Sequence, residues 1–258
     1  MTIVTPDQAQ ARAEEPAQES ALLEVVVLHP RDAAAATEGG ADRLLFLRAP
    51  EEGGLSPEPA QVSAIVRETD LPVRVMLRVD DGYGITGGSF RRLVGLAADY
   101  ASLGAEGVSF GFLDPDLLVD RASCAELATE IAPMPWTFHR GFDVTLEVDR
   151  AWRDVAGLPG IDAVASAGSS RGLAEGADDL IERASASPDV ARLLLASGGF
   201  VADLVPWLVR AGVRQFGVGA SVRPDRSWTK AYVDSRHVRS LRLLLDDALS
   251  RALGIPVD

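Results

Sequence analysis

The octapeptide Trp136-Thr137-Phe138-His139-Arg140-Gly141-Phe142-Asp143 joins a short apolar run to a group of polar side chains. The apolar residues at its start are typical of a buried strand. An imidazole, a guanidinium and, after a glycine turn, a carboxylate follow directly. In an α/β barrel, the reactive groups lie at the carboxyl ends of the strands. We therefore interpret this stretch as part of a barrel mouth, and we examine the chain on both sides for strands that end in the same way.

Eight short apolar runs, each followed by Gly, Pro or Asp and then by helical spacing, fill the chain from Leu22 onward. They begin near Leu22, Asp42, Val73, Gly107, Trp136, Ile161, Ala191 and Arg214. Apolar residues follow one another within these runs instead of alternating with polar ones, which indicates strands buried on both faces of a parallel sheet. Eight strand and helix units of about 30 residues each predict a single-domain α/β fold, a TIM (β/α)8 barrel, over residues 21–258.

Helical periodicity between the strands supports this assignment. One amphipathic pattern comprises Phe90, Leu93, Val94, Ala97, Tyr100 and Ala101, and another comprises Val238, Leu241, Leu245, Ala248 and Ala252. A third pattern, over residues 200–211, contains Pro206, which removes a backbone donor inside a helix. A helix that starts nearer Leu204, with Pro206 in its first turn, resolves the conflict.

The composition is that of one globular domain. The chain has 258 residues, of which 47% are hydrophobic, and this is enough for one large core. No apolar run approaches the roughly 20 residues of a membrane helix. Residues 1–20 carry Ala, Gln, Glu and Pro without periodicity, so we expect a disordered tail without a secretion signal. These features favour a cytoplasmic location.

Charge and cysteine content narrow the range of partners. The net charge of −13 argues against nucleic-acid or anionic-membrane binding, although a local arginine cluster can still bind a small anion. The single cysteine, Cys124, excludes an internal disulfide.

Arginines dominate the positions that follow the predicted strands. They are Arg48, Arg78, Arg140, Arg171 and Arg223. Guanidinium groups on one rim can bind carboxylate or phosphate through paired hydrogen bonds. The alternative is that these arginines have no binding role. Nearly all of the 25 basic residues are arginine, so some must fall near the rim by chance.

Two glycine turns strengthen the anion-site hypothesis. Gly198 and Gly199 follow the seventh predicted strand, and Gly219 ends the eighth. Many barrels bind phosphate at this place through exposed backbone N–H groups, which glycine leaves accessible. The plainer alternative is that the turns need glycine only for its backbone conformation.

Glu24 and His139 are the candidate acid and base groups. Glu24 lies inside the first apolar run and needs a partner when buried, which Arg43, Arg74 or Arg78 could supply. It is either a structural ion-pair partner or a catalytic base. His139 is either a general acid or base, positioned by Asp143 or a backbone carbonyl, or a structural histidine at a strand end.

Metal-binding patterns are weak. His29, His139 and His237 have no HxH or HxxxH spacing, and Cys124 falls in a predicted helix away from the rim. A site for a hard divalent ion that uses Glu51, Glu52 or Asp143 stays open. We expect no soft-metal site and no evident cofactor.

Several segments together resemble the CutC family of TIM-barrel proteins, which carry the label of copper homeostasis. The matching segments are LLEVVV, EGGADR, APEEGGLSPEP, LPVRVMLR, GFLDPDLLVD, WTFHRGFD and AGVRQF, within residues 21–222. The resemblance implies a cytoplasmic barrel that forms a homodimer or higher homo-oligomer. It also implies a rim site to which Glu24, Arg78, His139, Arg140 and Asp143 contribute.

The chain departs from the family pattern at several positions. The family's cysteines, which are invoked for copper, correspond to Val26 or Val27 and to Leu47. A glutamate, an arginine and a histidine of the pattern correspond to Leu45, Asp80 and Gly217. Without thiolates, Cu(I) lacks the soft ligands that it prefers. The sequence therefore argues against copper binding, and these losses indicate a divergent member.

Three functions follow as hypotheses. The first is a barrel that binds a small anionic or phosphorylated ligand at its carboxyl-terminal rim, through Arg78, Arg140, Gly198, Gly199 and Gly219. The second is copper handling, as the family label implies. The third is an isomerase or lyase that uses His139, and tentatively Glu24 and Asp143, as catalytic groups.

Overall fold

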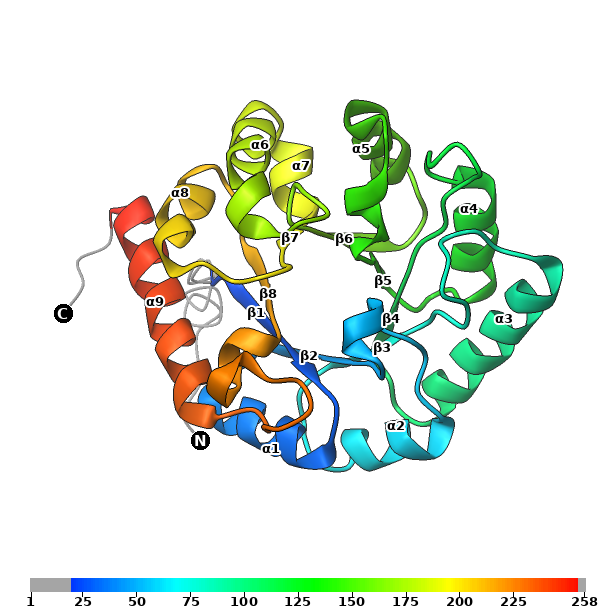
Figure 1. Cartoon of the computed structure of the whole chain (residues 1–258), viewed down its shortest axis with the longest axis horizontal. Helices are drawn as coiled ribbons and strands as arrows, with labels where there is room; N and C mark the ends of the chain where they lie inside the picture. The colour runs from blue at the N-terminus through cyan, green and yellow to red at the C-terminus, as the bar shows by residue number, and fades with distance from the viewer. Residues whose placement is uncertain (1–19, 255–258) are drawn as a thin grey trace, which may run out of the picture.

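The computed structural model describes residues 20–254, which form a closed barrel of eight parallel strands in sequence order (Figure 1). The strands are β1 (Leu22–Val27), β2 (Arg43–Phe46), β3 (Val73–Met76), β4 (Gly107–Phe110), β5 (Trp136–Phe138), β6 (Ile161–Ser166), β7 (Leu194–Ala196) and β8 (Gln215–Val218). The barrel closes where β8 pairs with β1, with Glu24 opposite Gly217. The predicted TIM barrel is confirmed. The tail predicted over residues 1–20 lies outside the described residues, apart from Ser20.

Helices surround the barrel (Figure 1). The α-helices are α1 (Pro30–Gly39), α2 (Pro59–Val66), α3 (Gly87–Ser102), α4 (Arg121–Glu130), α5 (Val148–Ala156), α6 (Leu173–Ala186), α7 (Pro188–Leu193), α8 (Val205–Arg210) and α9 (Ser235–Leu253). Short 3-10 helices lie in the connecting loops: η2 (Pro50–Glu52), η3 (Arg140–Val144), η4 (Ala202–Leu204), η5 (Ala220–Val222) and η6 (Pro224–Arg226).

Most of the hydrophobic core lies between the strands and the helices. The predicted helix patterns are largely confirmed, because α3 buries Leu93, Ala97 and Tyr100 and α9 buries Val238 and Leu245. Ala101 near the end of α3 and Ala252 near the end of α9 are exposed, so their predicted place on the buried face is wrong.

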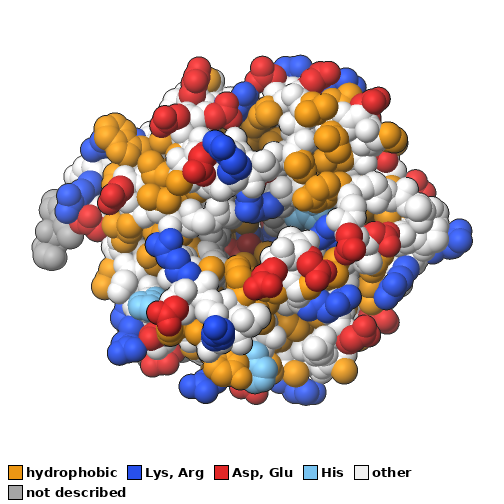
Figure 2. Space-filling model, viewed as in Figure 1, with side chains coloured by type: hydrophobic (Ala, Val, Ile, Leu, Met, Phe, Trp, Pro, Cys, Tyr) orange, Lys and Arg blue, Asp and Glu red, His pale blue; other side chains and the backbone are white. Residues whose placement is uncertain are grey.

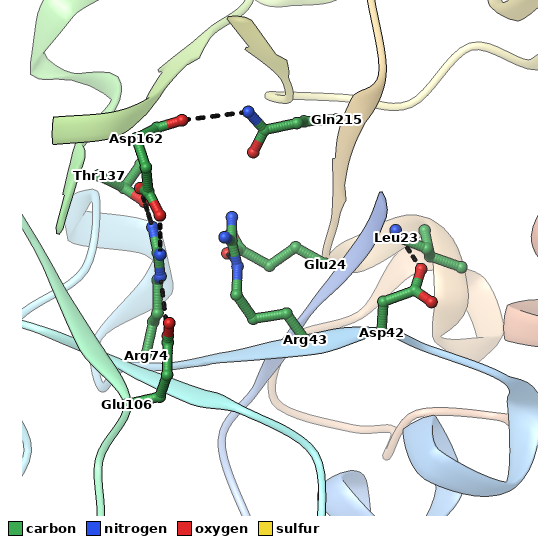
Figure 3. A network of polar contacts seen from close by, with 9 residues as sticks. All are labelled: Leu23, Glu24, Asp42, Arg43, Arg74, Glu106, Thr137, Asp162 and Gln215. Atoms are coloured by element: carbon green, nitrogen blue, oxygen red, sulfur yellow. Dashed lines mark hydrogen bonds and ion pairs between the residues drawn. The ribbon is translucent and has the colours of Figure 1, made fainter. Parts of the chain in front are cut away.

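The interior of the barrel is packed in a different way. Among the described residues, its apolar cluster contains only Ala163, Ala165 and Leu195, with Leu22 packed against them. Near the amino ends of the strands, the space is filled by polar side chains (Figure 3).

Arg74 is the centre of this polar network. Its Nη1 donates to Thr137 Oγ1 at 2.5 Å and to Asp162 Oδ1 at 2.6 Å, and its Nε lies 3.3 Å from Glu106 Oε2. Burial alone would lower the pKa of Arg74, but the hydrogen bond and the charge of Asp162 raise it above its ordinary value. Arg74 therefore stays charged and is fully paired.

The structure corrects the start of one strand and confirms a prediction about Pro206. The seventh strand begins at Leu194, not near Ala191, because the residues before it complete α7. Ser187 caps this helix by accepting the Val190 amide at 3.4 Å, and Pro188 follows in its first turn. A short apolar run cannot by itself distinguish a buried helix from a strand. As predicted, Pro206 lies in the first turn of α8.

Candidate functional site

A cavity of about 410 Å³ opens at the carboxyl ends of the strands and reaches into the barrel; we call it the central cavity. Figure 2 shows this face hollowed at its centre, with both basic and acidic side chains around the hollow. The lining residues come from every strand or from the loop that follows it. Those used below are Glu24, Val26, Leu45, Leu47, Met76, Ser109, His139, Arg140, Ala165, Leu195, Ser197, Gly198, Gly199, Phe200, Gly217, Gly219, Ala220, Ser221, Arg226 and Trp228.

The turns after β7 and β8 bring unpaired donors to the central cavity. Within residues 20–254, no acceptor is found for the backbone N–H groups of Gly198, Gly199, Phe200, Ala220 and Ser221. The hydroxyl oxygens of Ser197 and Ser221 are buried and also have no partner there. A buried polar group without a partner costs on the order of 1–3 kcal/mol. This side of the cavity is therefore built to receive hydrogen-bond acceptors.

Arg140 adds a guanidinium group, ion-paired with Asp143, to the same side. Its Nε donates to Asp143 Oδ2 at 2.9 Å and its Nη2 donates to the Ser169 carbonyl at 3.2 Å. The guanidinium lies directly against the Gly198 backbone, since a Cβ atom at Gly198 would be 2.4 Å from Arg140 Cζ. The side chain is still 37% exposed. Arg140 is therefore fixed in place with one face open to the cavity.

Asp143 positions Arg140 and does not contact His139 in the way we expected. Its buried carboxylate accepts the Ser166 hydroxyl at 2.6 Å and the Ala167 amide at 3.1 Å, in addition to Arg140. Burial raises its pKa, although these three partners favour the charged form. Asp143 thus ties η3 to the end of β6, and its predicted role in orienting His139 is wrong.

His139 is oriented by a backbone amide instead. Its Nδ1 accepts the Gly141 N–H at 3.0 Å, so the proton of the neutral ring is on Nε2. Burial, aided by the nearby charge of Arg78, lowers the pKa of His139 to about 4. The ring lines both the central cavity and a smaller pocket of about 130 Å³, which also contains Arg78, Tyr83 and Asp143. His139 is therefore a neutral hydrogen-bond donor near pH 7, and it is poorly suited to act as a base.

The depressed pKa of His139 predicts a specific loss of stability in acid. The unfolded chain takes up a proton below pH 6.5, whereas the folded protein excludes it until about pH 4. The free energy of unfolding should therefore fall as the pH falls through this window, by on the order of 3 kcal/mol. In His139→Asn, the amide oxygen can still accept the Gly141 N–H, and this loss should be absent. Urea unfolding of both proteins between pH 4 and pH 7 measures the difference, and parallel curves would show that folded His139 titrates freely.

Glu24 lies at the floor of the central cavity as half of a buried ion pair. Its carboxylate accepts Arg43 Nε at 2.7 Å, and both side chains are almost fully buried. The structure therefore favours the structural role among the two that the sequence left open, with Arg43 as the partner.

Arg78 is turned toward the backbone. Its guanidinium donates to the carbonyls of Glu52 at 2.8 Å and Gly54 at 3.0 Å, and it also contacts the carbonyls of Asp81 and Gly82. These bonds use four of the five N–H groups of an arginine. The predicted ligand contact of Arg78 is thus restricted to the smaller pocket beside His139, and its main task is to hold two loops together.

The other three rim arginines do not line the cavity. Arg48 donates from Nε to the Ser56 carbonyl at 2.7 Å. Arg223 is buried in an ion pair with Asp32, with Nη2 to Oδ2 at 2.7 Å, so its predicted place in an anion-binding rim is wrong. Arg171 is exposed and does not line the cavity.

The sequence analysis missed Arg226 and Trp228. Both line the central cavity from the loop after β8, and Arg226 has an unusual positive φ of 53°. The ring of Trp228 covers Gly219, where a Cβ atom would be 2.3 Å from the ring. Gly219 is thus needed for this close contact. A pair of non-glycine residues with positive φ, Asp225 and Arg226, is a sign of local strain that the sequence does not reveal.

The described residues contain no cluster of three or more His, Cys, Asp or Glu side chains that could hold a metal ion. Asp143 is bound by Arg140 and Ser166, whereas Glu51 and Glu52 are exposed on η2.

Between residues 20 and 254, no helix has the length and apolar character needed to cross a membrane.

Comparisons of the sequence with a family model and with curated relatives identify one family. The family model described as the CutC family matches residues 21–221. A family protein CutC from Salmonella paratyphi B is 29% identical over 203 residues, which cover 78% of this chain and 81% of the relative. Its counterpart from Klebsiella pneumoniae is 29% identical over 196 residues, with 76% and 78% covered. A crystal structure of a CutC protein from Streptococcus agalactiae, which is named for copper homeostasis, superposes with a TM-score of 0.67 at 20% identity. The superposition covers 77% of this chain and 98% of that one. The chain belongs to the CutC family.

Proposed function

We propose that the protein binds a small phosphorylated or otherwise anionic ligand in the central cavity. The observation that carries this proposal is the group of unpaired backbone N–H donors in the cavity that Arg140 also lines. They belong to Gly198, Gly199, Phe200, Ala220 and Ser221. Backbone amides and guanidinium groups are the donors that proteins use for phosphate oxygens. Arg226 brings a second positive charge to the same opening.

Copper does not fit the residues of this cavity. No thiol lines it, and its soft or borderline donors are the thioether of Met76 and the imidazole of His139, whose Nδ1 already accepts the Gly141 N–H. Cu(I) therefore lacks the thiolates that it prefers here. The single cysteine, Cys124, is buried in α4 against Phe112, and burial raises the pKa of its thiol to about 12. The family's cysteines correspond to Val26 or Val27 and to Leu47; Val26 and Leu47 present hydrocarbon to the cavity, and Val27 is buried in the outer core. We therefore derive no role for this chain from the copper homeostasis label.

Titration calorimetry with inorganic phosphate tests the proposal. We expect binding with a Kd below about 1 mM at low salt, and we expect Arg140→Met to weaken it at least tenfold, because a charge-assisted hydrogen bond contributes about 1.5–3 kcal/mol. The matched control is Arg171→Met, which removes the same charge from an exposed residue outside the cavity.

Two results would contradict the proposal. Equal weakening of phosphate binding in the two variants would mean that the affinity depends only on the net charge of the protein. Tight stoichiometric binding of Cu(I) under reducing conditions, in a protein that does not bind phosphate, would instead favour copper handling.

A second candidate function is catalysis of an isomerase or lyase type, and the position of His139 favours it. The ring lies between the central cavity and the smaller pocket, next to Arg78 and Arg140. A neutral imidazole with its proton on Nε2 can donate a hydrogen bond to a carbonyl oxygen and stabilise the negative charge that develops there. In this candidate mechanism, His139 acts as the polarising donor, and the base must be another group.

The oligomeric state and the cytoplasmic location stay predictions. A homodimer or higher homo-oligomer would appear in light scattering of the purified protein at more than the 27.3 kDa mass of one chain.

A further inference from the structure

The central cavity is much larger than a phosphate site requires. Its volume of about 410 Å³ is in the range of pockets that hold small organic molecules. It extends from the turns at the rim down to Glu24 and Gly217, which pair with each other across β1 and β8. A five-atom inorganic anion at the rim would leave the deep part of this space unused.

The walls of the deep part are apolar. They are formed by Val26, Leu45, Leu47, Met76, Ala165 and Leu195, all of which line the cavity. Gly217 contributes no side chain, and a Cβ atom there would already lie 3.0 Å from Ser197 Cβ. Apolar walls favour an apolar ligand body, because its transfer from water is favourable and no hydrogen bond is left unmade.

The floor is polar but carries no net charge. Glu24, 3% exposed, is neutralised by Arg43, and Figure 3 shows the two side chains together in the interior, opposite Arg74 and Asp162. Nη2 of Arg43 is buried without a partner among the described residues, but Arg43 itself does not line the cavity. The hydroxyl of Ser109, which also lines the cavity, makes no hydrogen bond within residues 20–254.

The ion pair of Glu24 and Arg43 favours an uncharged polar group as the part of the ligand that reaches the floor. A charged group would lose its hydration at the floor without a free opposite charge to compensate. A hydroxyl or amide group can donate to the Glu24 carboxylate and accept from the Ser109 hydroxyl. Arg74 does not compete for Glu24, since Asp162 and Thr137 already bind it.

We infer that the ligand is an elongated amphipathic anion: a phosphate or carboxylate head at the Gly198 and Ser221 turns, an apolar body, and an uncharged hydrogen-bonding group that reaches Glu24 and Ser109. This inference rests on the anion site proposed above. It names the class of ligand that the same cavity selects.

A series of phosphate esters tests the inference. Calorimetry would compare inorganic phosphate, ethyl phosphate, butyl phosphate and 4-hydroxybutyl phosphate on the full-length protein. We expect the affinity to rise about three- to fourfold for each methylene group that enters the apolar part, and to rise further with the terminal hydroxyl. Ser109→Ala should reduce the gain from the hydroxyl.

Variants of Leu45 check where the chain binds. Leu45→Trp fills part of the cavity and should abolish the difference between butyl phosphate and inorganic phosphate, whereas Leu45→Met, which conserves volume, should retain it. A wild-type protein that binds phosphate and all the esters equally, through Arg140, would overturn this inference and leave the anion site standing. No binding by any member of the series would overturn the anion site as well.

Discussion

Asp32→Asn is expected to lower the free energy of unfolding by about 3–5 kcal/mol, which is the cost of leaving one partner of a buried ion pair without its counter-charge. Asp32 is fully buried and Arg223 is almost so. The carboxylate binds Arg223 and also accepts the amides of Leu28 and Val233, each at 2.9 Å. The midpoint of thermal unfolding should fall by on the order of 10 °C.

The same substitution should loosen the loop that carries Arg226 and Trp228. Arg223 begins this loop and Val233 ends it, and Asp32 binds both. Calorimetric melting without phosphate measures the loss of stability. The shift of the melting temperature on adding phosphate measures the effect of the loosened loop on binding. Asp149→Asn, at an exposed ion pair with Arg183, is the control and should leave unfolding nearly unchanged. Similar small losses of stability in Asp32→Asn and Asp149→Asn would show that the ion pair of Asp32 and Arg223 does not hold the loop that carries Arg226 and Trp228.

Gly198→Ala is expected to weaken phosphate binding about a hundredfold. Gly198 has a φ of 85°, and a Cβ atom there would collide with the guanidinium of Arg140. Arg140 must therefore move, and a displacement of about 1 Å in a positioning group can cost two orders of magnitude. The Kd for phosphate from calorimetry measures the change.

Gly199→Ala is the matched control for Gly198→Ala. Gly199 also has a positive φ, 100°, so both variants bear a backbone penalty of about 1 kcal/mol. A Cβ atom at Gly199 would meet nothing within 4 Å, so Arg140 should stay in place. Gly199→Ala should therefore bind phosphate more tightly than Gly198→Ala. Equal affinities would mean that the turn, and not Arg140, determines binding.

The fold could be predicted from the sequence because local patterns and global architecture agree. Each strand is an apolar run of its own, and the glycine and aspartate residues that follow the runs mark the mouth. Arg140, Gly198 and Gly219 could be placed at one opening because the carboxyl ends of parallel strands converge there. The start of β7 could not be predicted, since Leu193 and Leu194 look alike in sequence yet end a helix and begin a strand.

The direction of each guanidinium could not be predicted. Arg78 faces carbonyl groups and Arg223 faces Asp32, which is 191 residues away in the sequence, whereas Arg140 faces the cavity. All three arginines follow a strand in the sequence, and only their tertiary contacts distinguish them. The missed residues, Arg226 and Trp228, lie in a loop whose path is set by the same distant contact with Asp32.

Most of the departures from the family pattern share one location in the structure. Val26, Leu45, Leu47 and Gly217 all line the central cavity, whereas Val27 is buried in the outer core and Asp80 binds the Ser89 hydroxyl at the surface. The cavity is thus apolar at these four positions, while Arg140, which lies in the matching segment WTFHRGFD, lines its rim. This combination is what an anion with an apolar body requires.

A crystal structure of the protein soaked with butyl phosphate tests the anion site most directly. We predict density for the phosphate group within hydrogen-bond distance of the Gly198, Gly199, Ala220 and Ser221 amides and of Arg140, with the butyl chain directed toward Leu45 and Glu24. An empty central cavity at saturating ester, or a phosphate group bound only at another surface, would contradict the account.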